Sequence, residues 1–227
     1  MVSLPAKLTW QRWWMVVSRS SMTLLRVLEY ERIQGLELRG ATLDVGGGRA
    51  SDYGRLVSIQ GEIQAVNLDP HMEPTFIADL NQGIPVAPGS YTNVISLNTL
   101  EHIWQDGFVL REMARVLEPG GNLYVLVPFL YRVHGSPGDY HRHTASFWVE
   151  MLEQIGFSRE SVEIEPLNFG PLAAPLSLIE FAFPSWVRMW LRAALLVASM
   201  VWSRLRLAGM RSSGSDTPLG YFIRACK

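Results

Sequence analysis

One stretch constrains the fold of this chain more than any other, the segment TLDVGGGRASDY at residues 42–53. A short apolar run leads directly into three glycines, which predicts a buried strand followed by a turn that residues lacking Cβ make easily. When such a turn ends a strand of an open α/β sheet and a helix follows, it is a site where nucleotides bind. The segment therefore predicts strand, turn and helix with a ligand at the turn. A tight connection without a ligand is the alternative.

The pattern after residue 41 predicts a parallel sheet with helices on both faces. Short, continuously apolar runs alternate with amphipathic stretches, as is typical of strands buried on both sides. Residues 109–117 have helical spacing, and the helix should stop at the PGG of 119–121. A second helix is expected over 145–155, with Thr144 as its N-cap. The expected strands are 42–45, 63–69, 75–79, 93–98, 122–129, 161–165 and 220–225.

Two segments differ in character from this α/β pattern. Residues 6–33 read as helix with a break at Ser18–Ser21 and a stop near Gly35. About fifty residues before the last expected strand begin with prolines, continue as a helix rich in Trp and Arg, and close with a Gly/Ser loop. The expected division is an N-terminal helical segment at 1–38 and a domain at 39–227 that carries a helical insertion at about 168–217.

The Trp-rich segments could contact each other or a membrane. The apolar runs at 13–17 and 189–202 are too short or too charged to span a bilayer, which takes about 20 apolar residues. We expect the two segments to pack together as a cap that hides their aromatic rings. The alternative is an open surface that binds anionic lipid. The residues concerned are Trp10, Trp13, Trp14, Trp186, Trp190 and Trp202, with Arg12, Arg19, Arg188, Arg192, Arg204 and Arg206.

Charge and cysteine content exclude several classes of protein. Twenty basic and 21 acidic side chains give a formal net charge of -1, which argues against a general nucleic-acid binder. The single cysteine, Cys226, excludes an intrachain disulfide and a cysteine-rich zinc site. We expect a cytoplasmic protein, with membrane association as the open alternative.

Polar residues follow the next three expected strands. Asp69 comes 21 residues after Gly48, at the end of the second strand, where a carboxylate can accept hydrogen bonds from ribose hydroxyls. Asp79 ends the third strand and Asn98 the fourth. Because the carboxyl ends of parallel strands lie at one edge of a sheet, these residues should border one crevice. An ordinary turn-forming role remains the alternative for each carboxylate taken alone.

These residues together resemble the class I S-adenosylmethionine-dependent methyltransferases. The first motif of that family is matched by Asp44, Gly46 and Gly48, with Ala50 at the third glycine position. The resemblance covers roughly residues 40–166 and 218–227. It implies a Rossmann-like α/β fold with a seven-stranded, mostly parallel sheet in the order 3-2-1-4-5-7-6. Only the last strand should be antiparallel.

The resemblance also implies a cofactor, S-adenosylmethionine, and its binding residues. The glycine turn would pass under the methionine portion, Asp69 would hold the ribose, and Asp79 would face the adenine amino group. Leu80 would lie against the adenine ring and Asn98 beside the methyl donor. The implied set is Asp44, Gly46, Gly47, Gly48, Asp69, Asp79, Leu80 and Asn98.

The candidate catalytic residues lie in the stretch PFLYRVHGSPGDYHRHT at 128–144. A histidine near its ordinary pKa can take a proton from an acceptor hydroxyl or amine, and His134 or His141 is the predicted base. His134, Asp139, His141 and His143 have the side chains of a metal site, but the transfer needs no metal and none is expected. We expect Glu101 and His102, after the fourth strand, to start the next helix and pin the loop.

The predicted function is transfer of a methyl group to an oxygen or nitrogen of a small-molecule, glycan or lipid-linked acceptor. The enzyme's main contribution would be positioning, because the cofactor supplies the reactive group. Two alternatives stay open, a nicotinamide-dependent oxidoreductase and a non-catalytic interaction protein of the same fold. The only lysines are Lys7 and Lys227, which counts against the Tyr-Lys pair of many such oxidoreductases.

Overall fold

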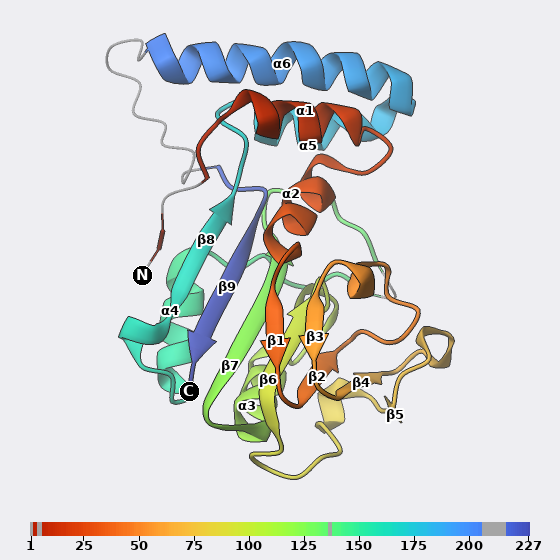
Figure 1. Ribbon diagram of the computed structural model, residues 1–227, viewed down its shortest axis with the longest axis vertical. Helices are drawn as coiled ribbons and strands as arrows, with labels where there is room; N and C mark the ends of the chain where they lie inside the picture. Colours follow the sequence, from red (N-terminus) through yellow and green to blue (C-terminus); the bar gives the residue numbers. More distant parts are fainter. Residues whose placement is uncertain (1, 4–5, 136–137, 206–216) are drawn as a thin grey trace.

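A seven-stranded sheet forms the centre of the protein (Figure 1). The computed structural model describes residues 2–3, 6–135, 138–205 and 217–227. Along the sheet the strands follow the order β5-β4-β2-β6-β7-β9-β8. All neighbours are parallel except β9, which runs antiparallel to both β7 and β8. This confirms the predicted order and the antiparallel last strand. The strands are β2 (Thr42–Val45), β4 (Ile63–Asn67), β5 (Phe76–Ile77), β6 (Tyr91–Leu97), β7 (Leu117–Pro128), β8 (Glu163–Leu167) and β9 (Gly220–Cys226).

Helices cover both faces of the sheet, which is why its strands are apolar throughout. Consecutive side chains of a strand point to opposite faces. Val94 of β6 accordingly packs in the cluster with α3 and α4, and its neighbour Ile95 packs in the cluster with α1, α2, α5 and α6. The helices are α1 (Trp10–Ser18), α2 (Leu24–Ile33), α3 (Asp106–Val116), α4 (Ala145–Gln154), α5 (Ala173–Ile179) and α6 (Ser185–Leu205).

The predicted helices on the α3 and α4 side are present, with small differences at their ends. α3 stops at Val116 and not at the PGG of 119–121, because Leu117 already pairs with Tyr91 as the start of β7. Thr144 is the N-cap of α4 in extended backbone, but its side chain makes no capping hydrogen bond. These differences leave the sheet and its connections as expected.

The prediction of a helix after the glycine turn is wrong. Only a 3-10 turn, Asp52–Arg55, follows, and then β3 (Ser58–Gln60) pairs in parallel with β1 (Glu37–Arg39) as a separate two-stranded sheet. Gly54 within the turn disfavours a helix, and few residues separate the glycines from β3. α2 and the small sheet cover this face instead, with Ile33, Leu38 and Val57 buried in the same cluster.

The N-terminal helices and the insertion form one layer above the carboxyl ends of the parallel strands. α1 lies beside α6 in this layer (Figure 1), and the Trp13 indole donates a hydrogen bond to the Ala193 carbonyl. The break between α1 and α2 falls at the predicted serine cluster, and Thr9 and Thr23 cap the two helices. The predicted association of the two segments is therefore confirmed.

Two of the arginines that an open lipid-binding surface would expose are buried in ion pairs. The Arg12 guanidinium lies 2.8 Å from a Glu31 carboxylate oxygen, and that of Arg192 lies 2.7 Å from Glu180, with both of the latter side chains fully buried. Each cation is inside because a carboxylate at short distance offsets its loss of hydration. Arg19 and Arg188 are half-buried, while Arg206 and the side chain of Arg204 lie outside the described residues.

No helix among the described residues combines the length and the apolar character that crossing a bilayer requires.

Candidate functional site

A cavity of about 510 Å³ opens at the carboxyl edge of the sheet. Its walls come from the segments that follow β2, β4, β5 and β6, so the four strand ends meet as predicted. Pockets for small ligands have volumes of about 300–1,000 Å³. The lining residues from the implied cofactor set are Gly46, Asp69, Asp79, Leu80 and Asn98, and further lining residues include Asn67, Thr99, His102, Trp104 and Tyr140.

The conformation of the glycine turn is fixed by a residue that the sequence analysis missed. The Asn67 side chain donates hydrogen bonds to the carbonyl oxygens of Gly46, at 2.6 Å, and Gly47, at 3.2 Å. Gly46 has a φ of 89°, and a Cβ there would overlap the Thr99 side chain, so glycine is required on both grounds. A polar residue within the apolar run 63–69 was the available signal for Asn67.

Asp44, Gly47 and Gly48 support the turn from beneath and do not line the cavity. Both carboxylate oxygens of Asp44 accept hydrogen bonds from the Tyr53 hydroxyl, at 2.9 and 2.8 Å. Burial raises the pKa of Asp44 to about 7, although the Tyr53 hydrogen bond acts in the opposite direction. A Cβ on Gly47 would overlap Asp44 and Tyr53, and one on Gly48 would overlap the Met72 carbonyl. These residues therefore fix the shape of the turn.

The carboxylates after β4 and β5 lie on the cavity wall with part of their hydrogen-bonding capacity in use. One oxygen of Asp69 accepts from the backbone of His71 at 2.9 Å, which orients the exposed side chain. Asp79 accepts from the backbone of Asn81 at 2.9 Å, and these hydrogen bonds lower its pKa. Leu80, which is buried, supplies an apolar surface next to Asp79.

Asn98 lies in a strained position between the cavity and a buried acid. Its φ of 54° is in the left-handed region that few non-glycine residues occupy, and such positions concentrate at functional sites. Its side-chain amide donates to the Glu29 carboxylate of α2 at 3.1 Å. Burial raises the pKa of Glu29, and the nearby Arg26 acts against that shift. Nothing in the sequence pattern singled out Glu29.

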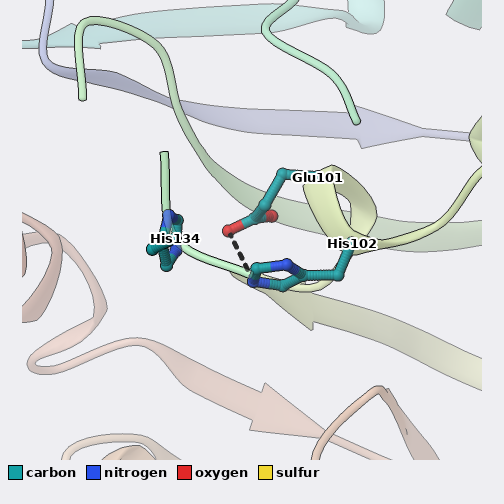
Figure 2. Close-up of side chains that lie close together, drawn as sticks. All are labelled: Glu101, His102 and His134. Atoms are coloured by element: carbon teal, nitrogen blue, oxygen red, sulfur yellow. Dashed lines mark ion pairs between the residues drawn. The ribbon is translucent and has the colours of Figure 1, made fainter. Parts of the chain in front are cut away.

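The histidines expected in one group lie in two. His102, expected only to pin the loop, lines the cavity and also contacts the loop through Nδ1, 2.6 Å from the Gly138 carbonyl. The His134 ring lies edge-on to His102 with 5.0 Å between centroids, and Glu101 is adjacent (Figure 2). His141 and His143 lie with Asp106 in a separate cluster.

Comparisons with known proteins agree with this geometry. Residues 43–125 match a family model described as a methyltransferase domain. A comparison with curated proteins gave no match.

Several solved structures share the fold. Phosphoethanolamine N-methyltransferase 2 of Haemonchus contortus, in complex with S-adenosyl-L-methionine, has a TM-score of 0.51 at 16% identity over 87% of this chain and 50% of that one. This chain thus spans about half the length of the nematode enzyme. An S-adenosylmethionine-dependent methyltransferase of Thermotoga maritima has a TM-score of 0.55 at 14% identity, with 96% and 94% covered. The [4+2]-cyclase SpnF has a TM-score of 0.53 at 15% identity, with 100% and 99% covered.

The family match ends within β7, and the antiparallel ending of the sheet beyond it follows the same pattern as the implied fold. Residues 43–125 thus match a methyltransferase domain, and the strand order of the whole sheet is that of the S-adenosylmethionine-dependent methyltransferase fold.

Proposed function

We propose that the protein transfers the methyl group of S-adenosylmethionine to an oxygen or nitrogen of an acceptor bound beside the segment after β7. The observation that carries this proposal is the cavity at four consecutive strand ends, with two carboxylates toward one end and Asn98 with His102 toward the other. The crevice at this edge is where open α/β sheets hold nucleotide-like ligands.

The residues on the cavity wall support one orientation of the methyl donor. Asp69 accepts hydrogen bonds from the ribose hydroxyls, and Asp79 and Leu80 hold the adenine. The methionine portion follows the turn at Gly46, so the sulfonium methyl points toward Asn98 and His102. In-line displacement from that position needs the acceptor atom to approach from the side of Tyr140 and residues 129–144.

The proton of the acceptor leaves, in this proposal, at the cluster of Glu101, His102 and His134. His102 borders the cavity, and His134 packs against it. His141 is occupied elsewhere, since its Nε2 lies 3.2 Å from the Trp104 carbonyl and 3.7 Å from Asp106. Of the two predicted bases, His134 is therefore the one that the geometry favours.

The layer formed by α1 and α6 supports an acceptor that is attached to a lipid. Its helices pack together, but Trp10, Trp14, Trp186 and Trp190 are each more than half exposed, so the cap does not hide these rings as expected. Along α6 the exposed positions recur every four residues, at Trp186, Trp190, Ala194, Ala198 and Trp202. An apolar stripe of this kind, rich in Trp, suits the interface of a membrane.

Charge and position agree with that interpretation. Neither α1 nor α6 contains an acidic residue, whereas Arg19 and Arg188 border the layer. Phe181, just before α6, contacts Tyr131 with 5.6 Å between ring centroids and lies under the Arg132 guanidinium at 3.9 Å. The layer thus joins the segment after β7, from which the acceptor enters.

Calorimetric titration of the purified protein with S-adenosylmethionine, with a nicotinamide dinucleotide titrated in parallel, tests the donor assignment. Saturable binding of the methyl donor alone is the expected result. Binding of the dinucleotide instead would overturn it. Mass spectrometry of candidate sugar, lipid and amine acceptors, searching for the gain of one methylene, then identifies the acceptor.

A further inference from the structure

Glu101 is a buried carboxylate that accepts no hydrogen bond from the residues that the structure describes. Its side chain is 1% exposed. His102 Nε2 lies 3.7 Å from one of its oxygens, which allows an ion pair when His102 is protonated but is too far for a hydrogen bond. An uncompensated buried carboxylate is strongly unfavourable, so this position calls for a proton or a cation.

Two imidazoles beside Glu101 are held through Nδ1. His102 Nδ1 lies 2.6 Å from the Gly138 carbonyl oxygen, which accepts only if Nδ1 carries the proton. His134 Nδ1 lies 3.3 Å from an Asp139 carboxylate oxygen and 3.3 Å from the Arg132 carbonyl. A proton on each Nδ1 leaves a lone pair on each Nε2. Histidines that bind metals are oriented in this way, by a carbonyl or carboxylate on the other ring nitrogen.

The three side chains converge on one point (Figure 2). One ligand atom from each of Glu101, His102 and His134 lies within 4.8 Å of the others. Ligands of a tetrahedral metal at about 2.1 Å are roughly 3.4 Å apart, so the separations between these atoms must shorten by at most about 1.4 Å. His134, at 32% side-chain exposure, has the freedom to move inward.

In the second cluster the carboxylate of Asp106 has hydrogen-bond partners for both of its oxygens. One oxygen of Asp106 accepts from the Gly107 backbone at 2.7 Å, and the other lies 2.6 Å from His143 Nε2. His143 also stacks on Phe147 with 3.5 Å between ring centroids. Both oxygens of Asp106 therefore have partners, whereas both oxygens of Glu101 are unused as hydrogen-bond acceptors among the described residues.

We propose that Glu101, His102 and His134 bind a divalent transition-metal ion at the wall of the methyl-donor cavity. Two imidazoles and one carboxylate suit zinc, manganese, iron or cobalt better than calcium or magnesium. Three protein ligands leave a coordination position open, and His102 places it toward the cavity.

The role of the ion rests on the proposed function. An acceptor hydroxyl at the open position loses its proton to solvent more readily, because a bound cation lowers the pKa of an oxygen ligand. With the ion bound, His134 is its ligand and does not act as the base. The oxygen then forms a bond to the methyl carbon while the carbon–sulfur bond breaks. Its electron pair stays on sulfur, giving the neutral thioether.

Metal binding is tested without methyl transfer. The full chain is stripped with a chelator and titrated with Co²⁺, followed by visible absorption, and with Zn²⁺, followed by calorimetry. We expect one equivalent to bind, with affinity reduced at least tenfold in Glu101→Gln, His102→Gln and His134→Gln. His143→Gln is the matched control and should bind like the unchanged protein. Thermal melting of each variant verifies folding.

Three outcomes would overturn the metal proposal. They are no saturable binding, affinity in Glu101→Gln and His134→Gln equal to that of the unchanged protein, or loss of binding only in His143→Gln. Titration with S-adenosylmethionine in the same samples keeps the two proposals separate. Metal binding without donor binding contradicts the proposed function alone, and donor binding without metal binding contradicts the metal site alone.

Discussion

The side-chain amide of Asn67 lies 2.6 Å from the carbonyl oxygen of Gly46. Through this hydrogen bond the end of β4 fixes the turn that follows β2. Its other side-chain atom accepts from the backbone of Asp69 at 3.0 Å, so one residue aligns two walls of the cavity. Asn67→Asp keeps the shape, removes the donor and sets a charge against two carbonyl oxygens. We expect donor affinity to fall about tenfold or more, for a loss of about 1–3 kcal/mol. Calorimetry checks this, and Gln64→Ala, on the same strand away from the cavity, should bind normally.

Asp69→Ala should weaken the binding of S-adenosylmethionine. Loss of a charge-assisted hydrogen bond to ribose costs about 1.5–3 kcal/mol, or roughly ten- to a hundredfold in affinity. Asp69 is exposed, so the fold should be unaffected. Asp52→Ala, another exposed carboxylate near the glycine turn but off the cavity wall, serves as the control in the same titration. Equal affinity of the two variants would remove Asp69 from the donor site.

The stability of the protein should fall as the pH rises from about 4 to 7, in part through Asp44. Its pKa is about 7 in the fold against an ordinary value of 3.8, so the folded state holds a proton that the unfolded state has released. The stabilisation is complete below pH 4 and is lost as the pH rises through 7, with an effect on the order of 4 kcal/mol. Asp44→Asn should flatten this part of the curve of unfolding free energy against pH, measured by urea denaturation. A variant with the same slope as the unchanged protein would contradict the assignment.

His134→Gln should slow turnover by about 10²–10⁴ while donor affinity stays nearly constant. The reason is that His134 belongs to the cluster on the cavity wall, where the acceptor proton leaves. His141→Gln should have a much smaller effect, since His141 contacts Trp104 and Asp106 instead. Initial rates at saturating donor decide the point. A stronger loss in His141→Gln would transfer the role to the second cluster.

Replacing Trp186 and Trp190 together by Ser should abolish binding to anionic vesicles. Both rings are about two-thirds exposed on α6, which like α1 contains no acidic residue. Flotation with vesicles that contain phosphatidylserine measures the effect, and added salt should weaken binding of the unchanged protein. Trp104→Ser is a matched control, because Trp104 is equally exposed, at 67%, but lies at the cavity. Absence of vesicle binding by the unchanged protein would leave α1 and α6 as a closing element only.

Strand positions and strand order were predictable from the sequence, because burial on both faces leaves continuous apolar runs such as those of β2 and β6. The strand ends that line the cavity followed from the same argument. The helix expected after Gly48 from the strand-and-glycine pattern is absent, because Gly54 and the short distance to β3 leave room only for a 3-10 turn. Tertiary contacts decided the rest. Asn67 and Glu29 act through partners far away in the chain, and Glu101 stands out because, once buried, it accepts no hydrogen bond from the described residues.

The alternative of an open surface that carries Arg12 and Arg192 is excluded for these two residues for a related reason. An arginine in an amphipathic helix is expected to face water, and only the fold brings Glu31 and Glu180 close enough to draw these two inside. The residues of 128–144 that could bind a metal were likewise considered together because they lie close to one another in the chain. The fold divides them between Glu101 with His102 on one side and Asp106 on the other.

The buried pair of Arg192 and Glu180 has a consequence for how such a protein can diverge. Glu180 accepts a hydrogen bond from the Leu24 backbone, and Arg192 donates to the Val16 and Arg19 carbonyls. Segments more than 150 positions apart in the chain thus share one charge pair. Deleting either segment leaves one charged side chain buried without its partner, at a cost of about 3–5 kcal/mol. A lineage can therefore gain, trim or exchange the leading helices and the late insertion only as a single inherited module.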